Sequence, residues 1–128
     1  MAKQFSIFLE NRPGRLANLV ELMGSNGINF QAMSISEAGN YGIVRCIVDN
    51  DDKALAVMKD ANMAVNVADV LIMDFANIGT IVKIFEGAGI NIDYAYTVEK
   101  GRIVIKVSDM PKALNVIEGA KLRVYAKM

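Results

Sequence analysis

The chain contains the same pattern of residues twice, and this internal repeat constrains its fold more than any other feature. The segment LANLVELMGSNGINFQAMSISE at 16–37 aligns with IGTIVKIFEGAGINIDYAYTVE at 78–99 at a spacing of 62, with five identical positions. The segment VRCIVDNDDKALAVMKDA at 44–61 aligns with IVIKVSDMPKALNVIEGA at 103–120 at a spacing of 59, with six identical positions. Self-similarity at a fixed spacing is typical of a duplicated structural unit.

The spacing changes by three residues between Glu37 and Val44, where the first copy has a longer glycine-containing turn. Insertions confined to a turn are the difference expected between two copies of one domain. The 128 residues are therefore predicted to form two small domains, residues 1–68 and residues 69–128. A unit of this size buries little surface alone, which favours association with further units.

Each copy is predicted to have the element order β-α-β-β-α-β. Alternating apolar residues indicate a first strand at 5–9, and the apolar spacing of Leu16, Leu19 and Met23 indicates a helix that ends near Gly27. A second strand is expected at 29–37, and a third in which the side chains of Val44, Cys46 and Val48 share one face. Asp51 or Asp52 is expected to cap the second helix. A fourth strand near 64–67 runs almost directly into 70–74, the first strand of the second copy.

This order predicts an α+β, ferredoxin-like fold in two tandem repeats, with antiparallel sheets and both helices of each repeat on one face.

Composition excludes several function classes. The chain has no His and one Cys, so it holds no Ser-His-Asp triad, Cys-His dyad, His metal ligand or internal disulfide. Its formal net charge is zero, so no overall field attracts nucleic acid or an anionic membrane. The first residues, MAKQFSIFLENRPG, lack the apolar stretch and cleavage site expected of a signal peptide, and no run of 18 apolar residues occurs. We expect a cytoplasmic, non-enzymatic protein with no metal, no cofactor, and neither nucleic acid nor membrane as partner.

The first strand-to-helix junction is the candidate binding segment. Asn11, Pro13 and Gly14 stand where the first strand stops and the first helix begins. The N–H groups at a helix start favour a carboxylate, and an asparagine side chain can address either end of an amino acid. Alternatively, Asn11 is the N-cap of the helix and Pro13 lies near its first turn.

A second asparagine, Asn29 in the tripeptide GIN, recurs as Asn91 in the second copy. Its position after the helix is equally typical of a turn residue whose side chain bonds to the neighbouring backbone.

The segment ENRPGRL (10–16) followed by GIN (27–29) resembles the small-ligand-binding ACT domain, and nearly the whole chain resembles a tandem ACT-domain protein. The motif is similar to that of the serine-binding regulatory domain of phosphoglycerate dehydrogenase. The resemblance implies an amino acid bound between ACT units, contacted by Asn11 and Asn29, with Pro13, Gly14 and Leu16 forming the motif around it. It also implies a regulatory role.

The sequence departs from that relative in both copies. The relative has a His two positions before its first asparagine, where this chain has Leu9; the less polar wall favours an apolar ligand side chain over serine. At spacing 62 the second copy has Phe75 and Ala76 in place of Pro13 and Gly14. Asp74 is expected to take the part of Asn11 if the alignment slips by one residue, and to meet an ammonium group.

Three other functions are compatible with this element order. An RNA-recognition motif is disfavoured because the segments VRCIV (44–48) and IVIKV (103–107) hold no aromatic residue for base stacking. An acylphosphatase-like enzyme needs an arginine in an anion-binding loop, for which Arg12 and Arg15 are candidates. A structural or assembly subunit of a metabolic enzyme, with vestigial ligand sites, is the main alternative. We expect a homodimer of two tandem chains, with a metabolic enzyme as a possible partner.

Overall fold

The computed structural model describes residues 1–128. The chain divides into two compact units, one formed by Lys3–Ala68 and the other by Asp69–Met128 together with Met1–Ala2. The helices and strands, in chain order, are β1 (Ala2–Glu10), α1 (Arg15–Ser25), β2 (Phe30–Ala38), β3 (Tyr41–Val48), α2 (Asp51–Asp60), β4 (Ala64–Asp74), α3 (Ile78–Gly87), β5 (Ile92–Val98), β6 (Arg102–Val107), α4 (Met110–Gly119) and β7 (Val124–Tyr125).

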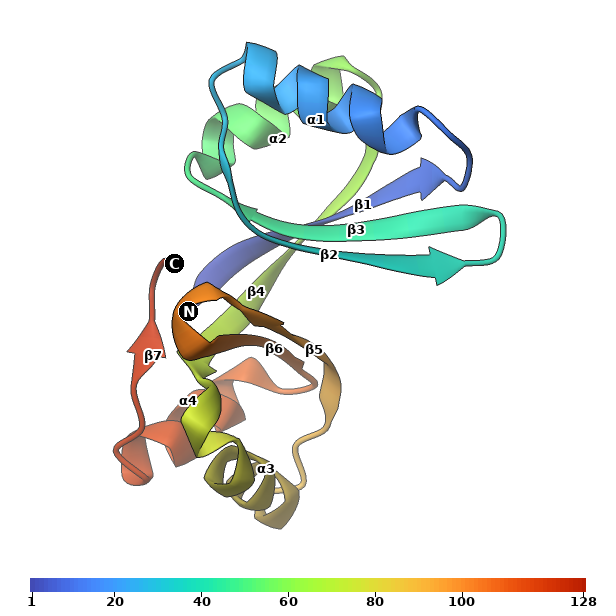
Figure 1. The fold of residues 1–128 in the computed structure, drawn as a ribbon. Coiled ribbons are helices and arrows are strands. Elements are labelled where there is room, and N and C mark those ends of the chain that lie inside the picture. The colour runs from blue at the N-terminus through green and yellow to red at the C-terminus, as the bar shows by residue number, and fades with distance from the viewer. The chain divides into compact units, whose positions relative to one another are not determined.

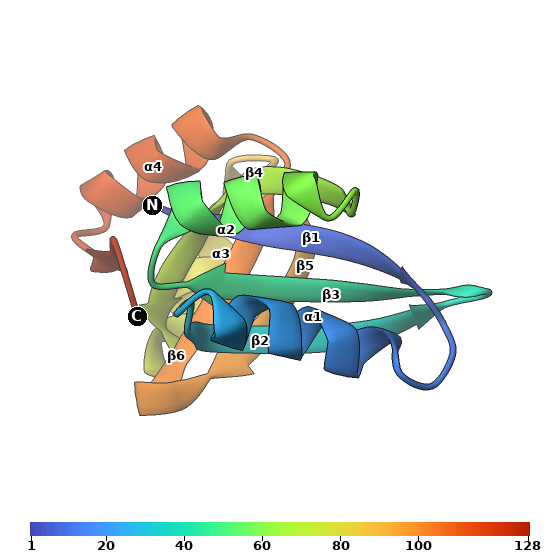
Figure 2. The same ribbon diagram turned by 90° about the horizontal axis from the view of Figure 1, so that it is seen from above.

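The first unit is an antiparallel sheet covered on one face by α1 and α2 (Figure 1). Strand β3 pairs with β2 on one side and with β1 on the other, and β4 is the next strand beside β1. The two helices lie side by side over the strands when the unit is seen from above (Figure 2). The predicted α+β fold with β-α-β-β-α-β order is confirmed.

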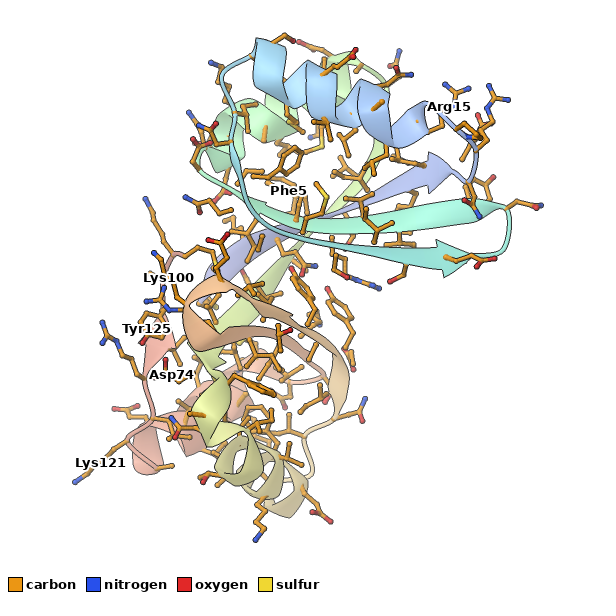
Figure 3. All side chains as sticks on the ribbon, viewed as in Figure 1. Phe5, Arg15, Asp74, Lys100, Lys121 and Tyr125 are labelled. Atoms are coloured by element: carbon orange, nitrogen blue, oxygen red, sulfur yellow. The ribbon has the colours of Figure 1, made fainter.

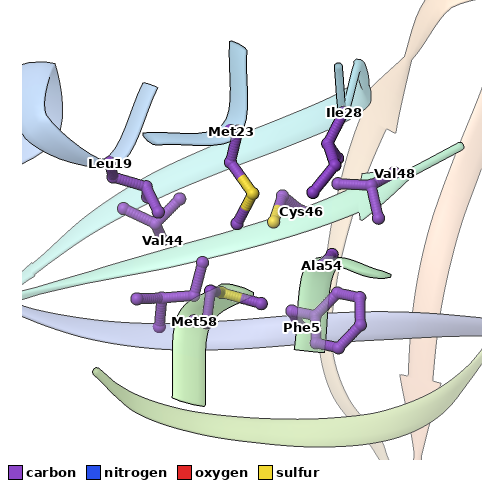
Figure 4. Close-up of a cluster of buried hydrophobic side chains, with 10 residues drawn as sticks. Phe5, Leu19, Met23, Ile28, Val44, Cys46, Val48, Ala54 and Met58 are labelled. Atoms are coloured by element: carbon purple, nitrogen blue, oxygen red, sulfur yellow. The ribbon is translucent and has the colours of Figure 1, made fainter. Parts of the chain in front are cut away.

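The core of the first unit lies between this sheet and its helices (Figure 4). Alternate residues of a strand point to one face, so Phe5 and Ile7 of β1 and the predicted trio on β3 all turn toward the helices. The helices contribute residues four apart, which lie on one helix face. The buried residues of this core are Phe5, Ile7, Leu19, Met23, Ile28, Val44, Cys46, Val48, Ala54 and Met58.

The second unit repeats this arrangement with strands β5, β6, the second part of β4 and β7. Its core contains Leu71, Met73, Ile81, Phe85, Ile90, Ile103, Ile105, Val107, Ala113 and Ile117. The β2–β3 pairing has an irregularity between Phe30 and Ala32, and the β5–β6 pairing has one between Ile92 and Tyr94. The duplication therefore preserves even a local bulge.

The helix ends are also repeated, with one correction to the sequence prediction. Gly27 after α1 and Gly89 after α3 have φ of 70° and 71°, the left-handed conformation typical of a glycine that ends a helix. Helix α2 is capped by Asn50, whose side chain accepts a hydrogen bond from the Lys53 N–H at 3.1 Å. The prediction of Asp51 or Asp52 as the cap is wrong, because both residues lie inside the first turn.

Candidate functional site

The first unit has a hollow of about 190 Å³ where β1 leads into α1. Its lining comes from the end of β1, the following loop, the first turn of α1, and from β2 and β3. The lining residues are Leu9, Glu10, Asn11, Arg12, Arg15, Leu16, Ile35, Gly42 and Val44. We call this feature the β1–α1 hollow.

One part of the β1–α1 hollow is apolar. Leu9 lies opposite Gly42 in the β1–β3 pairing, and Ile35 lies opposite Val44 in the β2–β3 pairing. Gly42 contributes no side chain, so the space beside Leu9 stays open. Ile35 is 55% exposed, although it is on the face of β2 that carries core residues. The core face of the sheet thus continues beyond the helices as an accessible apolar surface.

The other part of the hollow is charged. Glu10 forms ion pairs with two arginines, with Arg12 Nε 3.4 Å from its Oε2 and Arg15 Nη2 3.7 Å from its Oε1. The side chains of Glu10 and Arg12 are more than half exposed, whereas that of Arg15 is 35% exposed. The Nε of Arg15 is buried and has no hydrogen-bond partner. Figure 3 shows Arg15 at the start of α1, beside the loop that follows β1.

Asn11 joins this loop to the turn between β2 and β3. Its backbone N–H donates to the Asn40 carbonyl at 2.9 Å, and its Nδ2 donates to the Gly39 carbonyl at 3.4 Å. The N-cap interpretation of Asn11 is wrong, because Gly14 is the N-cap of α1 and no side chain caps the helix. Asn11 is instead part of the lining of the hollow.

Pro13 and Gly14 shape the loop without lining the hollow. Gly14 has φ of 90°, a conformation that side chains with a Cβ rarely adopt. A Cβ built at Gly14 would meet no atom within 4 Å. The glycine is therefore required by the backbone conformation rather than by crowding, and it lets the chain turn from β1 into α1.

Asn29 does not line the hollow, and its donors are engaged elsewhere. Its backbone N–H donates to Asp49 Oδ1 at 3.0 Å and its Nδ2 donates to Asp49 Oδ2 at 2.8 Å. These bonds hold the pKa of Asp49 below its ordinary value. In the second unit the Asn91 N–H makes the corresponding bond, to Ser108 Oγ at 2.9 Å, whereas its Nδ2 donates to a different position, Asp93 Oδ1, at 3.1 Å.

Asp74 ends β4 and binds a tyrosine of its own unit. Its Oδ1 accepts from the Tyr125 hydroxyl at 2.9 Å, and the Arg102 guanidinium lies 3.6 Å from the centre of the Tyr125 ring. Figure 3 shows Asp74 and Tyr125 side by side. In the β4–β6 pairing Asp74 is opposite Arg102. At the spacing of 59 the residue of the first unit that is equivalent to Arg102 is Ile43, and Ile43 is opposite Phe8 in the β1–β3 pairing. Asp74 therefore corresponds to Phe8 by register, and the expected correspondence to Asn11 does not hold.

The same register shows where the two copies differ most. Twelve positions separate Ile7 from Leu19, whereas eight separate the equivalent core residues Met73 and Ile81. The second unit joins strand to helix through the short turn Phe75–Asn77. The loop that forms the β1–α1 hollow is thus an addition specific to the first unit.

Some site residues were missed by sequence reasoning. The sequence indicates Arg12 and Arg15 only as candidates for the anion-binding loop of an enzyme, and Glu10 only as part of the motif. The sequence feature that indicates these three residues is the segment ENRPGR, which brings one carboxylate and two guanidinium groups into one short loop. Ile35, Gly42 and Val44 reach the hollow through strand pairing, which no local pattern specifies.

Three kinds of feature outside the β1–α1 hollow bear on function: metal ligands, the thiol and the length of the helices. No group of three or more carboxylate or thiol side chains gathers as a metal site would require. Burial raises the pKa of the Cys46 thiol to about 12, so it carries no reactive thiolate at neutral pH. No helix has the length and apolar character needed to cross a bilayer.

Comparison with known proteins gives consistent matches. Residues 1–127 match a family model described as an ACT domain pair. The crystal structure of protein BT0572 from Bacteroides thetaiotaomicron is 34% identical with a TM-score of 0.89, over 98% of this chain and 92% of that chain.

Two more distant structures share the fold. They are the regulatory subunits of aspartate kinase from Thermus thermophilus, in a ligand-free form, and from Thermus flavus. The first is 17% identical with a TM-score of 0.63, over 92% of this chain and 91% of that chain. The second is 16% identical with a TM-score of 0.65, over 93% of this chain and 92% of that chain. A search of curated proteins gives no match.

Proposed function

Because the chain belongs to the family of ACT domain pairs, we propose that it is a non-catalytic regulatory protein that senses an aliphatic amino acid. The ligand site is the β1–α1 hollow of the first unit. The protein acts in the cytoplasm, in keeping with its free, buried Cys46 thiol.

The observation that carries this proposal is the division of the β1–α1 hollow into an apolar and a charged part. An aliphatic amino acid has the same division, with a hydrocarbon side chain at one end and a zwitterion at the other. The volume of about 190 Å³ is below the ~300–1,000 Å³ of drug-sized ligand sites, which suits a small metabolite. Leu9 and Ile35 offer no hydrogen bond to a serine hydroxyl, so serine would lose its bonds to water without replacement.

The proposal assigns one site to each chain. The second unit has the short junction Phe75–Asn77 and lacks the loop around which the hollow is built. Its Asp74 is engaged by Tyr125 at 2.9 Å, and releasing that carboxylate for a ligand would break an existing hydrogen bond. We assign the second unit a supporting role.

A sensor without a catalytic site reports its ligand through assembly or through a partner. We propose a homodimer, and a metabolic enzyme whose activity depends on the ligand. The Thermus structures are regulatory subunits of aspartate kinase; at their identity the likeness is one of fold, and the enzyme partner of this chain is part of the proposal. The ligand can shift the assembly only by its difference in affinity for the two states.

A thermal-shift screen of the twenty amino acids tests the proposed function. Leucine, isoleucine or valine is expected to raise the melting temperature, because a ligand that binds the native state alone stabilises it. Asn11→Ala is expected to abolish the shift, and Asn91→Ala, the matched asparagine of the second unit, to preserve it. A screen in which no amino acid shifts the melting temperature overturns the proposal, and serine as the strongest ligand overturns the aliphatic assignment.

A second candidate function, an assembly subunit with a vestigial ligand site, is favoured by one observation. A hollow of about 300 Å³ is lined by Phe8, Ala38, Tyr41 and Ile43, and Tyr41 is 56% exposed. An accessible apolar surface of this kind favours a protein contact. Sedimentation analysis of Tyr41→Asp separates the two candidates: loss of oligomers in a chain that binds no amino acid favours the assembly subunit.

A further inference from the structure

The charged groups of the β1–α1 hollow form an ion pair that is loosely held. Glu10 meets Arg15 at 3.7 Å and Arg12 at 3.4 Å, with the Glu10 side chain 56% exposed. Exposed ion pairs at such distances contribute little to stability, because both side chains keep good solvation when they separate. Glu10 and Arg15 can therefore exchange partners at small cost.

Arg15 also carries an unused donor. Its Nε is buried without a hydrogen-bond partner, although the tip of the same guanidinium reaches Glu10. A buried donor without an acceptor is unfavourable, more so on a charged group. A carboxylate that approaches the guanidinium edge engages Nε and one Nη together, which is the two-point geometry preferred by arginine.

We propose that Glu10 and Arg15 hold the two charged ends of the amino acid, Glu10 its α-ammonium and Arg15 its α-carboxylate. This inference rests on the proposed function and adds the residues that recognise the zwitterion. The ligand enters between the two side chains and replaces their mutual ion pair by two new ones. Arg12 stays beside Glu10, and Asn11 lies between them in the chain.

The charges favour this exchange. The ligand separates Glu10 from Arg15 and places its own ammonium and carboxylate between them, so the net charge of the hollow does not change. The ammonium and the carboxylate each gain a partner that a neutral site would not supply. A simple amine leaves Arg15 unpaired, and a simple acid leaves Glu10 with Arg12 as its one partner. The site therefore selects free amino acids over simple acids and simple amines.

The test uses three probes with the same hydrocarbon end: leucine, 4-methylpentanoic acid, which lacks the ammonium, and 3-methylbutylamine, which lacks the carboxylate. Titration calorimetry gives the Kd of each probe for the wild-type chain and for the variants Glu10→Gln and Arg15→Gln. Glu86→Gln and Lys83→Gln, at exposed positions of α3, are the matched charge controls. Urea unfolding of each variant confirms that the fold is intact.

Glu10→Gln is expected to weaken the binding of leucine and 3-methylbutylamine by about 10- to 100-fold. It is expected not to weaken the binding of 4-methylpentanoic acid, which no longer has to displace Glu10 from Arg15. Arg15→Gln is expected to weaken the binding of leucine and 4-methylpentanoic acid by a similar factor, and not to weaken the binding of the amine, which no longer has to displace Arg15 from Glu10. Equal losses for all three probes, or no loss, overturn the assignment of Glu10 and Arg15 while amino-acid sensing stands. Wild-type protein that binds none of leucine, isoleucine and valine overturns the aliphatic assignment of the proposed function and this inference together.

Discussion

Asn29 and Asp49 exchange three hydrogen bonds that tie the start of β2 to the end of β3. The N–H and Nδ2 of Asn29 donate to the Asp49 carboxylate at 3.0 and 2.8 Å, and the Asp49 N–H donates to the Asn29 carbonyl at 3.2 Å. In the second unit the Asn91 N–H donates to Ser108 Oγ and the Ser108 N–H donates to the Asn91 carbonyl, each at 2.9 Å. The repeated asparagine thus serves the same connection in both units, and its partner at the end of the facing strand is the ionisable Asp49 in the first unit and Ser108 in the second.

The Asn29–Asp49 contact predicts a specific acid sensitivity. Because its bonds lower the pKa of Asp49 below the ordinary value of 3.8, the stabilisation is fully present above that value and is lost as the pH falls through the lower folded-state pKa. Asp49→Asn is expected to unfold at a lower urea concentration than wild type at pH 7, with the difference shrinking below pH 4. Urea midpoints measured between pH 2 and pH 7 check this. A difference that is constant across that range would show that ionisation of Asp49 plays no part.

Features that depend on neighbouring residues could be predicted from the sequence, and features that depend on strand pairing could not. Local spacing predicts that Val44 and Cys46 share one face of a strand and that α1 ends near Gly27. Both features are present in the structure. The alternative interpretation of Asn11 as a cap is wrong because its partner carbonyl, that of Asn40, lies in a turn far along the chain.

Asp74 illustrates the same limit. The spacing of 62 holds from Leu16 through β2, so an alignment extends it back across the junction without contradiction. The register of β4 against β6 shows instead that the second unit lacks four positions there. The β1–α1 hollow also depends on the pairing of Leu9 with Gly42 and of Ile35 with Val44, which no single segment encodes.

Gly14→Ala tests the role of backbone conformation at the loop. With φ of 90°, an alanine there is strained by about 1–2 kcal/mol, although its Cβ would contact nothing within 4 Å. The free energy of unfolding is expected to fall by about that amount. Gly24→Ala is the control, since Gly24 lies in the last turn of α1 with equal space around it; there alanine is expected to raise the free energy of unfolding by at most about 1 kcal/mol. Equal effects from the two substitutions would contradict this account.

Tyr125→Phe tests how β7 is attached to the second unit. The change removes the 2.9 Å bond to Asp74 and retains the ring under Arg102. The free energy of unfolding is expected to fall by about 1 kcal/mol, measured by urea denaturation, with amino-acid affinity unchanged. Tyr41→Phe, at an exposed position, is expected to have no effect on stability. A change in ligand affinity with Tyr125→Phe would mean that the second unit takes part in the site.

Cys46 is expected to resist thiol reagents in the native protein. Burial raises the pKa of its thiol to about 12, so both access and the thiolate form are denied to a disulfide reagent at pH 8. Absorbance after adding such a reagent is expected to stay flat in buffer and to report one thiol per chain in 6 M guanidinium chloride. Rapid reaction of the folded protein would contradict the burial of this residue.

The most direct test of the central claim is the number of leucine molecules that each chain binds, measured by titration calorimetry. The added loop of the first unit predicts one leucine per chain, with binding lost in Asn11→Ala and retained in Asn91→Ala. Two leucines per chain, or binding that survives Asn11→Ala, would contradict a site built on the β1–α1 junction of the first unit.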